Sequence, residues 1–287
     1  MADTVGEADL RAENVSRIVT GFALQEYKMK QVVMIQPSTS WKESYYQEGS
    51  AELTGGTGSA IKGIPRGANF PYGEANWTKV NSWLEKYGME GVIHYEDVMT
   101  GALDVIGRTL LRIARAVTNS VDAEIYGQLL ANVGNTVTIT ASYEWDSATI
   151  ANRDPVQDIL NGIKEIFIDN YDALQDGYLL VNPIEYANLL GNSNVRNAGK
   201  FYTDDVTRNG RVGILCGLRM IVSNVVTTDT GTLVVKGKEC GTWKSAVPLT
   251  VVTIYDPGVK WTVRAWEIGV TQVTNPEAVC VITNTAK

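Results

Sequence analysis

The feature that most constrains this chain is a long helical repeat of apolar residues over residues 96–131. Apolar side chains recur at steps of three and four residues, which favours a helix and excludes a strand. They are Met99, Leu103, Ile106, Leu110, Ile113, Val117, Val121, Ile125 and Leu129. At 1.5 Å per residue, one helix over this stretch would be about 50 Å long and would cross a whole domain. Glu96 and Asp97 suit its electropositive start, and Gly134 lies just beyond its end.

Composition narrows the class of protein. The chain has 287 residues, of which 44% are apolar, so it can bury a large core and form two lobes. A formal net charge of -7 without any basic run argues against a dedicated nucleic-acid binder. No apolar run approaches the roughly 18 residues that span a bilayer, and we expect no membrane contact.

The three cysteines, Cys216, Cys240 and Cys280, show no CxxC spacing. This pattern favours a reducing compartment and argues against a disulfide framework or a zinc site. No signal peptide opens the sequence, and we expect folding in the cytosol.

Residues 1–40 mix charged residues with scattered apolar ones and include a short helical pattern near residues 17–27. No core of their own is expected for them. The pattern predicts an arm that becomes ordered by packing on another surface, and a frayed terminus is the alternative.

A projecting hairpin is predicted next. Residues 41–46 have a strand pattern, residues 49–73 are rich in glycine, and Trp77, Val80 and Trp83 indicate a returning strand. Long loops without structure of their own are uncommon in compact domains. Exposed aromatic residues on such a hairpin would need a partner to cover them.

The second half of the chain predicts a mixed α+β fold. Asp154 and Pro155 suit the N-cap and first position of a second helix. Residues 178–181 form a buried strand, and Asn182 with Pro183 starts a short helix. Gly217 separates two short apolar runs within residues 212–222. Further strands are expected at residues 137–140, 232–235, 247–254, 259–270 and 278–283.

The order of these parts resembles the major capsid protein of tailed double-stranded DNA bacteriophages, which has the Hong Kong 97 fold. The local sequences that contribute most to the resemblance are residues 179–183 with Tyr186 and Leu189, residues 213–218, and residues 259–273 leading to residues 275–279. The resemblance covers nearly the whole chain. It implies an N-terminal arm (1–40), an extended loop (41–79), a peripheral domain with a spine helix (80–151 and 231–270) and an axial domain (152–230 and 271–287).

In function, the resemblance implies a structural protein of the virion that self-assembles into hexamers and pentamers of an icosahedral shell enclosing double-stranded DNA. Assembly would occur in the host cytoplasm. Partners would be other copies of the chain, a portal protein, scaffolding or decoration proteins, and packaged DNA through weak non-specific contacts. No cofactor and no metal are implied.

Two alternatives stay open. Shells of encapsulin nanocompartments resemble the same fold and enclose cargo enzymes, although the long hairpin and the arm favour a virus. A soluble α+β enzyme is the remote alternative, because no GxSxG elbow accompanies the single histidine, His94, and residues 55–60 lack the third glycine of a phosphate loop. We expect His94 to serve in packing and predict no catalytic residues.

Two groups of residues are candidates for contacts. Lys62, Arg66 and Trp77 are candidate inter-subunit contacts near the hairpin. Arg108, Arg112 and Arg115 lie on one face of the long helix and could meet DNA or acidic groups of a neighbour. A solvated face, with Asp104 paired to Arg108, is the commoner outcome for such a stripe.

Two expectations concern the mature particle. About forty residues precede the hairpin, too few for a cleaved scaffolding segment plus an arm, so Met1 or Ala2 is expected to remain. Some shells of the family carry isopeptide bonds between a lysine and an asparagine. Lys62 could supply the amine, but the corresponding loop, residues 255–258, contains no asparagine, so we expect non-covalent shells.

Overall fold

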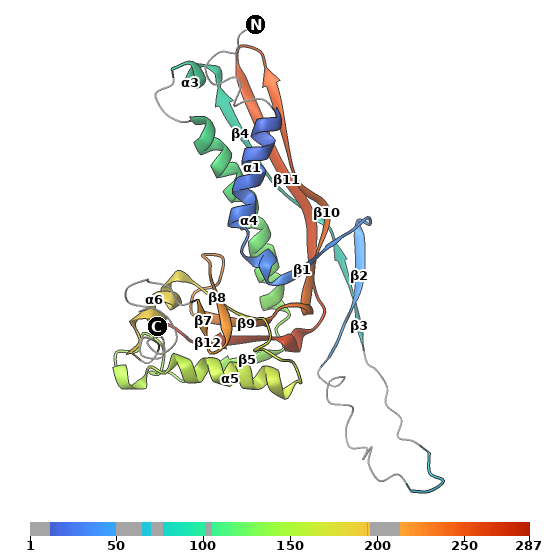
Figure 1. Ribbon diagram of the computed structural model, residues 1–287, viewed down its shortest axis with the longest axis vertical. Helices are drawn as coiled ribbons and strands as arrows, with labels where there is room; N and C mark the ends of the chain where they lie inside the picture. The colour runs from blue at the N-terminus through green and yellow to red at the C-terminus, as the bar shows by residue number, and fades with distance from the viewer. Residues whose placement is uncertain (1–11, 50–64, 70–76, 101–104, 194, 196–212) are drawn as a thin grey trace.

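The computed structural model describes residues 12–49, 65–69, 77–100, 105–193, 195 and 213–287. These residues form an elongated lobe, a second lobe at one end of it, and a two-stranded hairpin that projects from the junction (Figure 1). Helices and strands are mixed along the chain, which confirms the predicted α+β class.

The elongated lobe is built on a four-stranded sheet. Its strand order is β1 (Val33–Pro37), β10 (Gly237–Asp256), β11 (Lys260–Val273) and β4 (Glu85–His94). β1 pairs with β10 in parallel, and the other two pairs are antiparallel. Helices α1 and α4 lie along one face of this sheet (Figure 1).

The predicted spine helix is confirmed over α4 (Val105–Ala131). At 1.5 Å per residue this helix is about 40 Å long. Its apolar stripe faces the core, and Leu110, Val117 and Leu129 are buried. The expected start differs, because Glu96 and Asp97 lie in the first turn of a separate short helix, α3 (Tyr95–Thr100). Residues 101–104, between the two helices, lie outside the described residues.

Residues 12–33 agree with the expectation of a segment that has no core of its own and is ordered by packing on another surface, and that surface belongs to the same chain. Helix α1 (Ala12–Glu26) packs against α4 and β10 of the same chain, and Val15, Val19 and Ala23 are completely buried. These side chains are spaced four residues apart and are small, so they form a narrow stripe that lets two helices approach closely. The short helix η1 (Met29–Gln31) follows and leads into β1.

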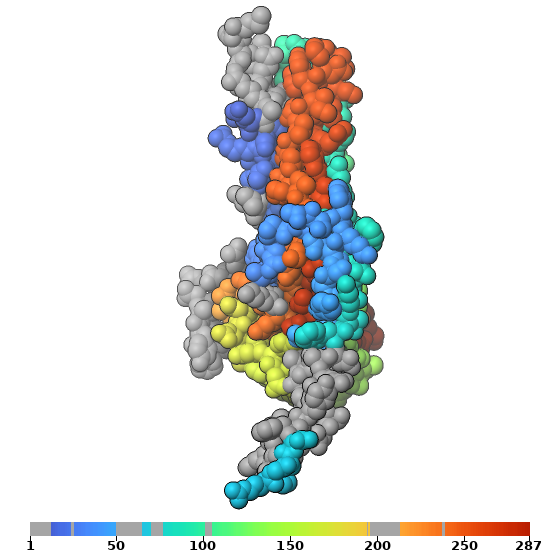
Figure 2. Space-filling view, turned by 90° about the vertical axis from the view of Figure 1, so that its right-hand side faces the viewer, coloured from blue at the N-terminus to red at the C-terminus, as the bar shows by residue number. Residues whose placement is uncertain are grey.

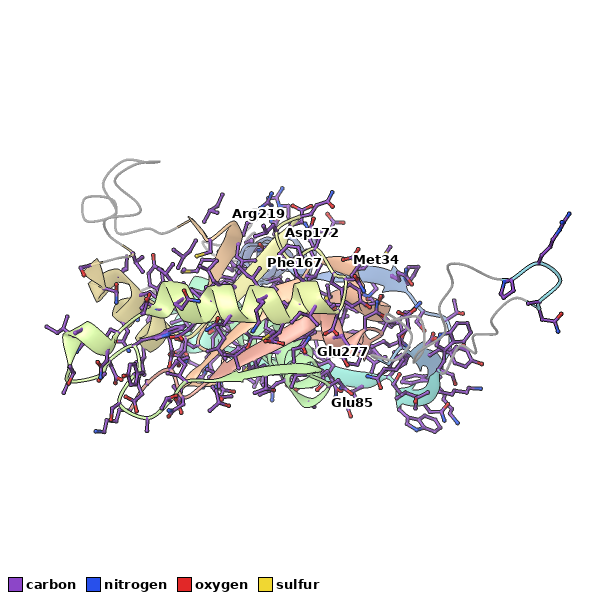
Figure 3. The ribbon with its side chains drawn as sticks, turned by 90° about the horizontal axis from the view of Figure 1, so that it is seen from below. Met34, Glu85, Phe167, Asp172, Arg219 and Glu277 are labelled. Atoms are coloured by element: carbon purple, nitrogen blue, oxygen red, sulfur yellow. The ribbon has the colours of Figure 1, made fainter. Side chains whose placement is uncertain are left out.

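The second lobe contains a six-stranded sheet. Its order is β5 (Asn135–Thr138), β12 (Val279–Thr283), β9 (Thr230–Val235), β6 (Gly177–Val181), β8 (Leu218–Val222) and β7 (Ile214–Leu215). Helix α5 (Pro155–Ile168) lies across one face of this sheet, as Figure 3 shows from below. All residues of β6 are buried, as predicted. The short helices η2 (Ile150–Asn152), α6 (Pro183–Gly191) and η3 (Pro276–Ala278) complete the chain.

Both predicted helix starts in this lobe are confirmed. The Asp154 side chain accepts a hydrogen bond from the Gln157 N–H at 3.3 Å, and Asn182 accepts one from the Ile184 N–H at 3.1 Å. Pro155 and Pro183 follow directly, where a missing N–H costs nothing. Gly217, at a φ of 85°, lies in the turn between β7 and β8 that the sequence indicated.

The sheet pairing corrects the expected domain limits at two places. β5 and β9 belong to the six-stranded sheet, although residues 80–151 and 231–270 were expected in the other lobe. β9 pairs with β6 on one side and with β12 on the other, so it is an interior strand of the second lobe. The chain therefore crosses between lobes after α4 and again between β9 and β10.

The hairpin consists of β2 (Lys42–Gln47) and β3 (Thr78–Trp83), paired antiparallel from Lys42 opposite Trp83 to Gln47 opposite Thr78. This confirms the two predicted hairpin strands. Much of the glycine-rich stretch between them, residues 50–64 and 70–76, lies outside the described residues. β3 continues into β4 through Leu84 alone.

Candidate functional site

The hairpin presents large aromatic side chains to solvent. Trp41, Tyr46, Trp77 and Trp83 are 66%, 58%, 57% and 64% exposed. The rings of Tyr46 and Trp77 lie 6.1 Å apart, and the Lys42 ammonium lies 5.4 Å from the Trp83 ring. A soluble chain rarely exposes so many large aromatic groups close together unless another surface covers them. In the space-filling view, β2 (blue) and β3 (cyan) lie below the broad surface of β10 (Figure 2).

The opposite face of the hairpin is anchored to the body. The Gln47 side-chain amide lies 3.4 Å from both the Asn132 side-chain oxygen and the Val273 carbonyl, and the Glu48 N–H donates to the Thr274 carbonyl at 2.9 Å. Ser38 and Glu43 are hydrogen-bonded at the other end of β2. β2 is therefore held at both ends, and the end that leads into the glycine-rich loop is bonded at the junction of the two lobes. Its other face, which carries Tyr46, is exposed.

The three candidate contact residues near the hairpin lie in different places. Trp77 directly precedes β3 and is exposed, and its contact with a neighbouring subunit stays a prediction. Arg66 is exposed in the short segment 65–69, which lies away from both lobes at the far right of Figure 3. Lys62 lies outside the described residues.

The basic stripe on α4 is solvent-facing. Arg108, Arg112 and Arg115 are all exposed. The Arg115 Nε donates to the Glu26 carboxylate of α1 at 2.7 Å, so part of this stripe is neutralised within the chain. Asp104, the expected partner of Arg108, lies outside the described residues.

Three further observations bear on the other classes of protein considered. His94 ends β4 and is exposed, so the expectation of a packing role for it is wrong. Within the described ranges, no three histidine, cysteine or acidic side chains gather as metal ligands would. None of the helices described has both the length and the apolar character to cross a membrane.

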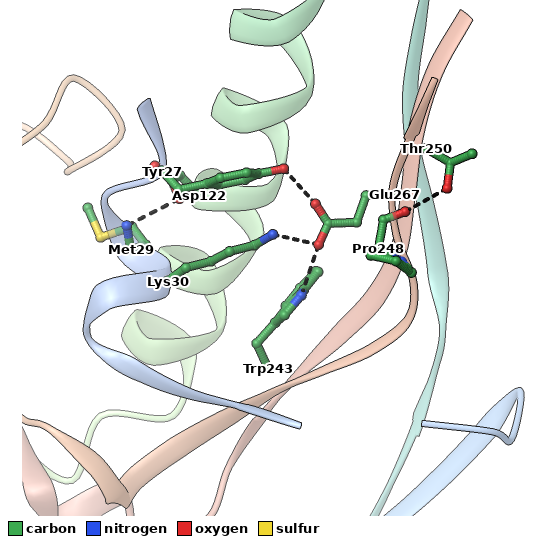
Figure 4. A network of polar contacts seen from close by, with 8 residues as sticks. All are labelled: Tyr27, Met29, Lys30, Asp122, Trp243, Pro248, Thr250 and Glu267. Atoms are coloured by element: carbon green, nitrogen blue, oxygen red, sulfur yellow. Dashed lines mark hydrogen bonds and ion pairs between the residues drawn. The ribbon is translucent and has the colours of Figure 1, made fainter. Parts of the chain in front are cut away.

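A buried polar cluster, overlooked in the sequence, lies between α1, α4 and β11. Glu267 of β11 is 1% exposed and accepts hydrogen bonds from the Tyr27 hydroxyl at 2.6 Å and the Trp243 indole at 3.2 Å (Figure 4). The Lys30 ammonium lies 2.5 Å from the same carboxylate and 3.7 Å from the centre of the Tyr27 ring. Burial lowers the pKa of Lys30, an effect that Glu267 opposes, and burial beside Glu267 raises the pKa of Tyr27.

Asp122 of α4 forms the second half of the cluster. It is 3% exposed and accepts the backbone N–H groups of Lys28 at 3.0 Å and Met29 at 3.2 Å. Burial raises the pKa of Asp122 to about 6, although the two N–H groups favour its ionised form. The signal in the sequence was an acidic residue at a core-facing position of the helical repeat, next to Val121.

Comparison with known proteins decides the family. The phage capsid protein family matches residues 84–282. The chain belongs to the phage capsid protein family. No protein of curated function matches the sequence.

Solved structures agree with the family on the fold. The capsid protein described here is similar to the virus-like particle of Pyrococcus furiosus, with a TM-score of 0.64 and 12% identity over 94% of this chain and 98% of that chain. It is similar to the capsid of cyanophage P-SCSP1u, with a TM-score of 0.65 and 14% identity over 88% of this chain and 86% of that chain. It is also similar to the mature capsid of bacteriophage PhiM1, with a TM-score of 0.63 and 13% identity over 90% of this chain and 87% of that chain. The predicted Hong Kong 97-type fold is therefore confirmed.

This capsid protein is a structural shell protein of a virion, from a family of structural proteins. The related solved structures include capsids, which supports self-association of the chain. The outward aromatic face of the hairpin is the most prominent candidate surface for that association.

Proposed function

We propose that the chain assembles as hexamers and pentamers of an icosahedral shell that encloses double-stranded DNA. The observation that carries this proposal is the hairpin: β2 is bonded to the body, while Tyr46, Trp77 and Trp83 are exposed on one face and Trp41 is exposed just before β2. Exposed apolar patches of this kind mark surfaces that a partner covers.

In this proposal the elongated lobe is the peripheral domain and the six-stranded lobe is the axial domain around which subunits gather. The hairpin is the extended loop that lies over a neighbour, and α1 with the residues before it is the N-terminal arm. Cohesion comes from apolar burial at about 25 cal/mol per Å², summed over many modest contacts. Arg66, Lys62 and Trp77 are proposed to contact the neighbouring subunit.

The remaining partners are also proposals. The exposed Arg108 and Arg112 provide weak, salt-sensitive contacts to packaged DNA. A portal protein and scaffolding or decoration proteins complete the particle, which assembles in the host cytoplasm.

The test of the hairpin is assembly of purified protein, followed by electron cryomicroscopy. Deleting residues 55–73, or changing both Trp77 and Trp83 to serine, should abolish stable shells and leave the circular dichroism spectrum of the body unchanged. The matched control changes both residues to phenylalanine, which keeps aromatic area and should keep shells. Normal shells from the serine variant would contradict the role of the hairpin.

The contents of the particles separate the two kinds of shell. Particles purified from the native source should contain nuclease-protected double-stranded DNA. Particles that contain a protein cargo and no nucleic acid would instead identify a nanocompartment of the encapsulin type.

A further inference from the structure

Residues 28–30 connect three parts of the molecule. The Lys28 ammonium donates to the carbonyl oxygen of Val222, at the end of β8 in the second lobe, at 2.7 Å. The N–H groups of Lys28 and Met29 donate to Asp122 of α4, and Lys30 pairs with Glu267 of β11. The segment that follows α1 therefore touches the spine helix, the long sheet and the second lobe at once.

The attachment of α1 depends strongly on this segment. The completely buried side chains of α1, Val15, Val19 and Ala23, are small, and Ile18 and Phe22 are half-buried. Fixing the backbone and side chains of a 15-residue helix has an entropy cost that opposes this burial. The ion pair between Glu26 and Arg115 is partly exposed, and such pairs contribute little.

The polar contacts of the segment favour two discrete arrangements. Glu267 and Asp122 are 1% and 3% exposed, so removing residues 28–30 while both stay buried would leave Glu267 without its countercharge and Asp122 without its N–H donors. A state with the segment removed and the carboxylates still buried is costly in free energy, because removing the partner of a buried charge destabilises a protein far more than removing the partner of an exposed charge. Either all contacts are made, or the segment moves away and water reaches both carboxylates.

We propose that residues 28–30 form a releasable latch, which when closed holds α1 on α4 and fixes the second lobe against the elongated lobe, and when open frees α1 and lets the lobes change their relative orientation. The inference goes beyond shell assembly and concerns the single subunit. Its partners all belong to the same chain, so it can be tested without reference to the proposed function.

The latch should respond to pH through Asp122. The charged groups facing Asp122 are Lys28 and Lys30. The other titratable groups of the cluster are Tyr27 and Glu267. Burial raises the pKa of Asp122 from 3.8 to about 6 in the closed latch, whereas an open latch returns it to its ordinary value. A raised pKa means that closure takes up a proton, so the latch tightens as the pH falls through about 6 and is weakest above it.

Hydrogen–deuterium exchange of the full-length chain tests the latch directly. Asp122→Ala should reduce the protection of residues 12–26 by at least about tenfold, since the N–H groups of Lys28 and Met29 lose their acceptor. The control Thr118→Ala alters a buried side chain one turn away on α4, whose hydroxyl bonds only to carbonyls of its own helix among the described residues. It should leave residues 12–26 protected, and equal losses in both variants would overturn the proposal.

Two further measurements remain decisive if Asp122→Ala fails to fold. After correction for intrinsic exchange rates, lowering the pH from 8 to 5 should increase the protection of residues 12–26 by about tenfold in the natural sequence and not in Asp122→Asn. Lys28→Met changes an exposed side chain and should speed exchange in β8 while the strand β6 stays protected. A pH response that persists in Asp122→Asn, or an unchanged β8 in Lys28→Met, would contradict the latch.

Discussion

Glu267 and Asp122 are acidic side chains inside the elongated lobe, and each has a different kind of partner. Glu267 has a cation, Lys30, and two neutral donors, Tyr27 and Trp243. Asp122 has backbone N–H groups. A buried pair such as Lys30 with Glu267 adds little to stability compared with apolar residues of the same volume, yet breaking it is costly.

Lys30→Met should lower the free energy of unfolding by about 3–5 kcal/mol, because Glu267 then stays buried without a countercharge. Urea unfolding followed by tryptophan fluorescence measures this. The control Glu90→Gln removes an exposed ion pair with Arg264, at the same 2.5 Å separation, and should cost no more than about 1 kcal/mol. A similar decrease in the free energy of unfolding in the two variants would show that the buried ion pair matters no more to stability than the exposed one.

The cysteines give a second prediction at the residue scale. Burial, with Glu165 nearby, raises the pKa of Cys280 to about 12, and Cys240 is completely buried. Cys216 is half-buried at the turn between β7 and β8. A thiol-alkylating reagent applied to native protein should therefore modify Cys216 alone, and all three thiols in denaturant, as read by mass spectrometry. Modification of Cys240 or Cys280 in native protein would be the contrary result.

At the scale of single elements, two glycines lie in opposite surroundings, one closely packed and one open. A Cβ atom at Gly177, where β6 begins, would lie 1.9 Å from the Ala173 carbonyl oxygen and 2.5 Å from a Leu218 methyl group. Gly127 lies in α4 with no neighbouring atom within 4 Å of that position. The same substitution should therefore have opposite effects at the two sites.

Gly177→Ala should destabilise the second lobe by several kcal/mol or prevent soluble expression, because a strand backbone must move. Gly127→Ala should stabilise the chain by roughly 0.5–1 kcal/mol through helix propensity. Thermal unfolding of the two variants decides this. A neutral Gly177→Ala would mean that β6 can shift at little cost.

Elements with strong local patterns could be predicted from the sequence. α4 has a repeat over many turns, α5 has an N-cap followed by proline, and β6 is an uninterrupted apolar run. The aromatic strands of the hairpin were predictable for the same reason, since Trp41, Tyr46 and Trp83 flank a glycine-rich stretch.

Features that depend on distant parts of the chain could not be predicted in this way. β1 pairs with β10, which lies near the other end of the sequence, and β5 and β9 join the second lobe through strand pairing. The small stripe of α1 gave too little apolar signal to reveal its docking on α4. The charged cluster was missed because acidic residues are usually solvated, and only the packing of α1 and β11 around Asp122 and Glu267 buries them.

At the scale of the whole molecule, the loop between β10 and β11 bears on how shells are held together. Asp256 ends β10 and Lys260 begins β11, and the residues between them include Pro257 and Gly258 but no asparagine. An ionised aspartate is a poor acceptor for a lysine amine. The absence of an asparagine there supports cohesion by docking and ion pairs.

Particles boiled in detergent should therefore run as a single band near the chain mass of 31.3 kDa on a denaturing gel. Non-covalent contacts dissociate under these conditions, whereas isopeptide bonds persist. A ladder of linked multimers would overturn the expectation, and mass spectrometry of the ladder would identify the residues joined. Particles treated with a lysine-blocking reagent before boiling provide the control for links formed by heating.

The passage from β3 into β4 has a mechanical consequence. Only Leu84 separates the two strands; it is buried against Ile268 and Val270, and its N–H donates to the Trp41 carbonyl. Further along β4, Gly91 lies so close to α4 that an added Cβ would come within 2.6 Å of Ile113. β3 and β4 thus form one continuous path from the aromatic hairpin to the spine helix. A twist of the hairpin strands would therefore be passed along β4 to its close contact with α4.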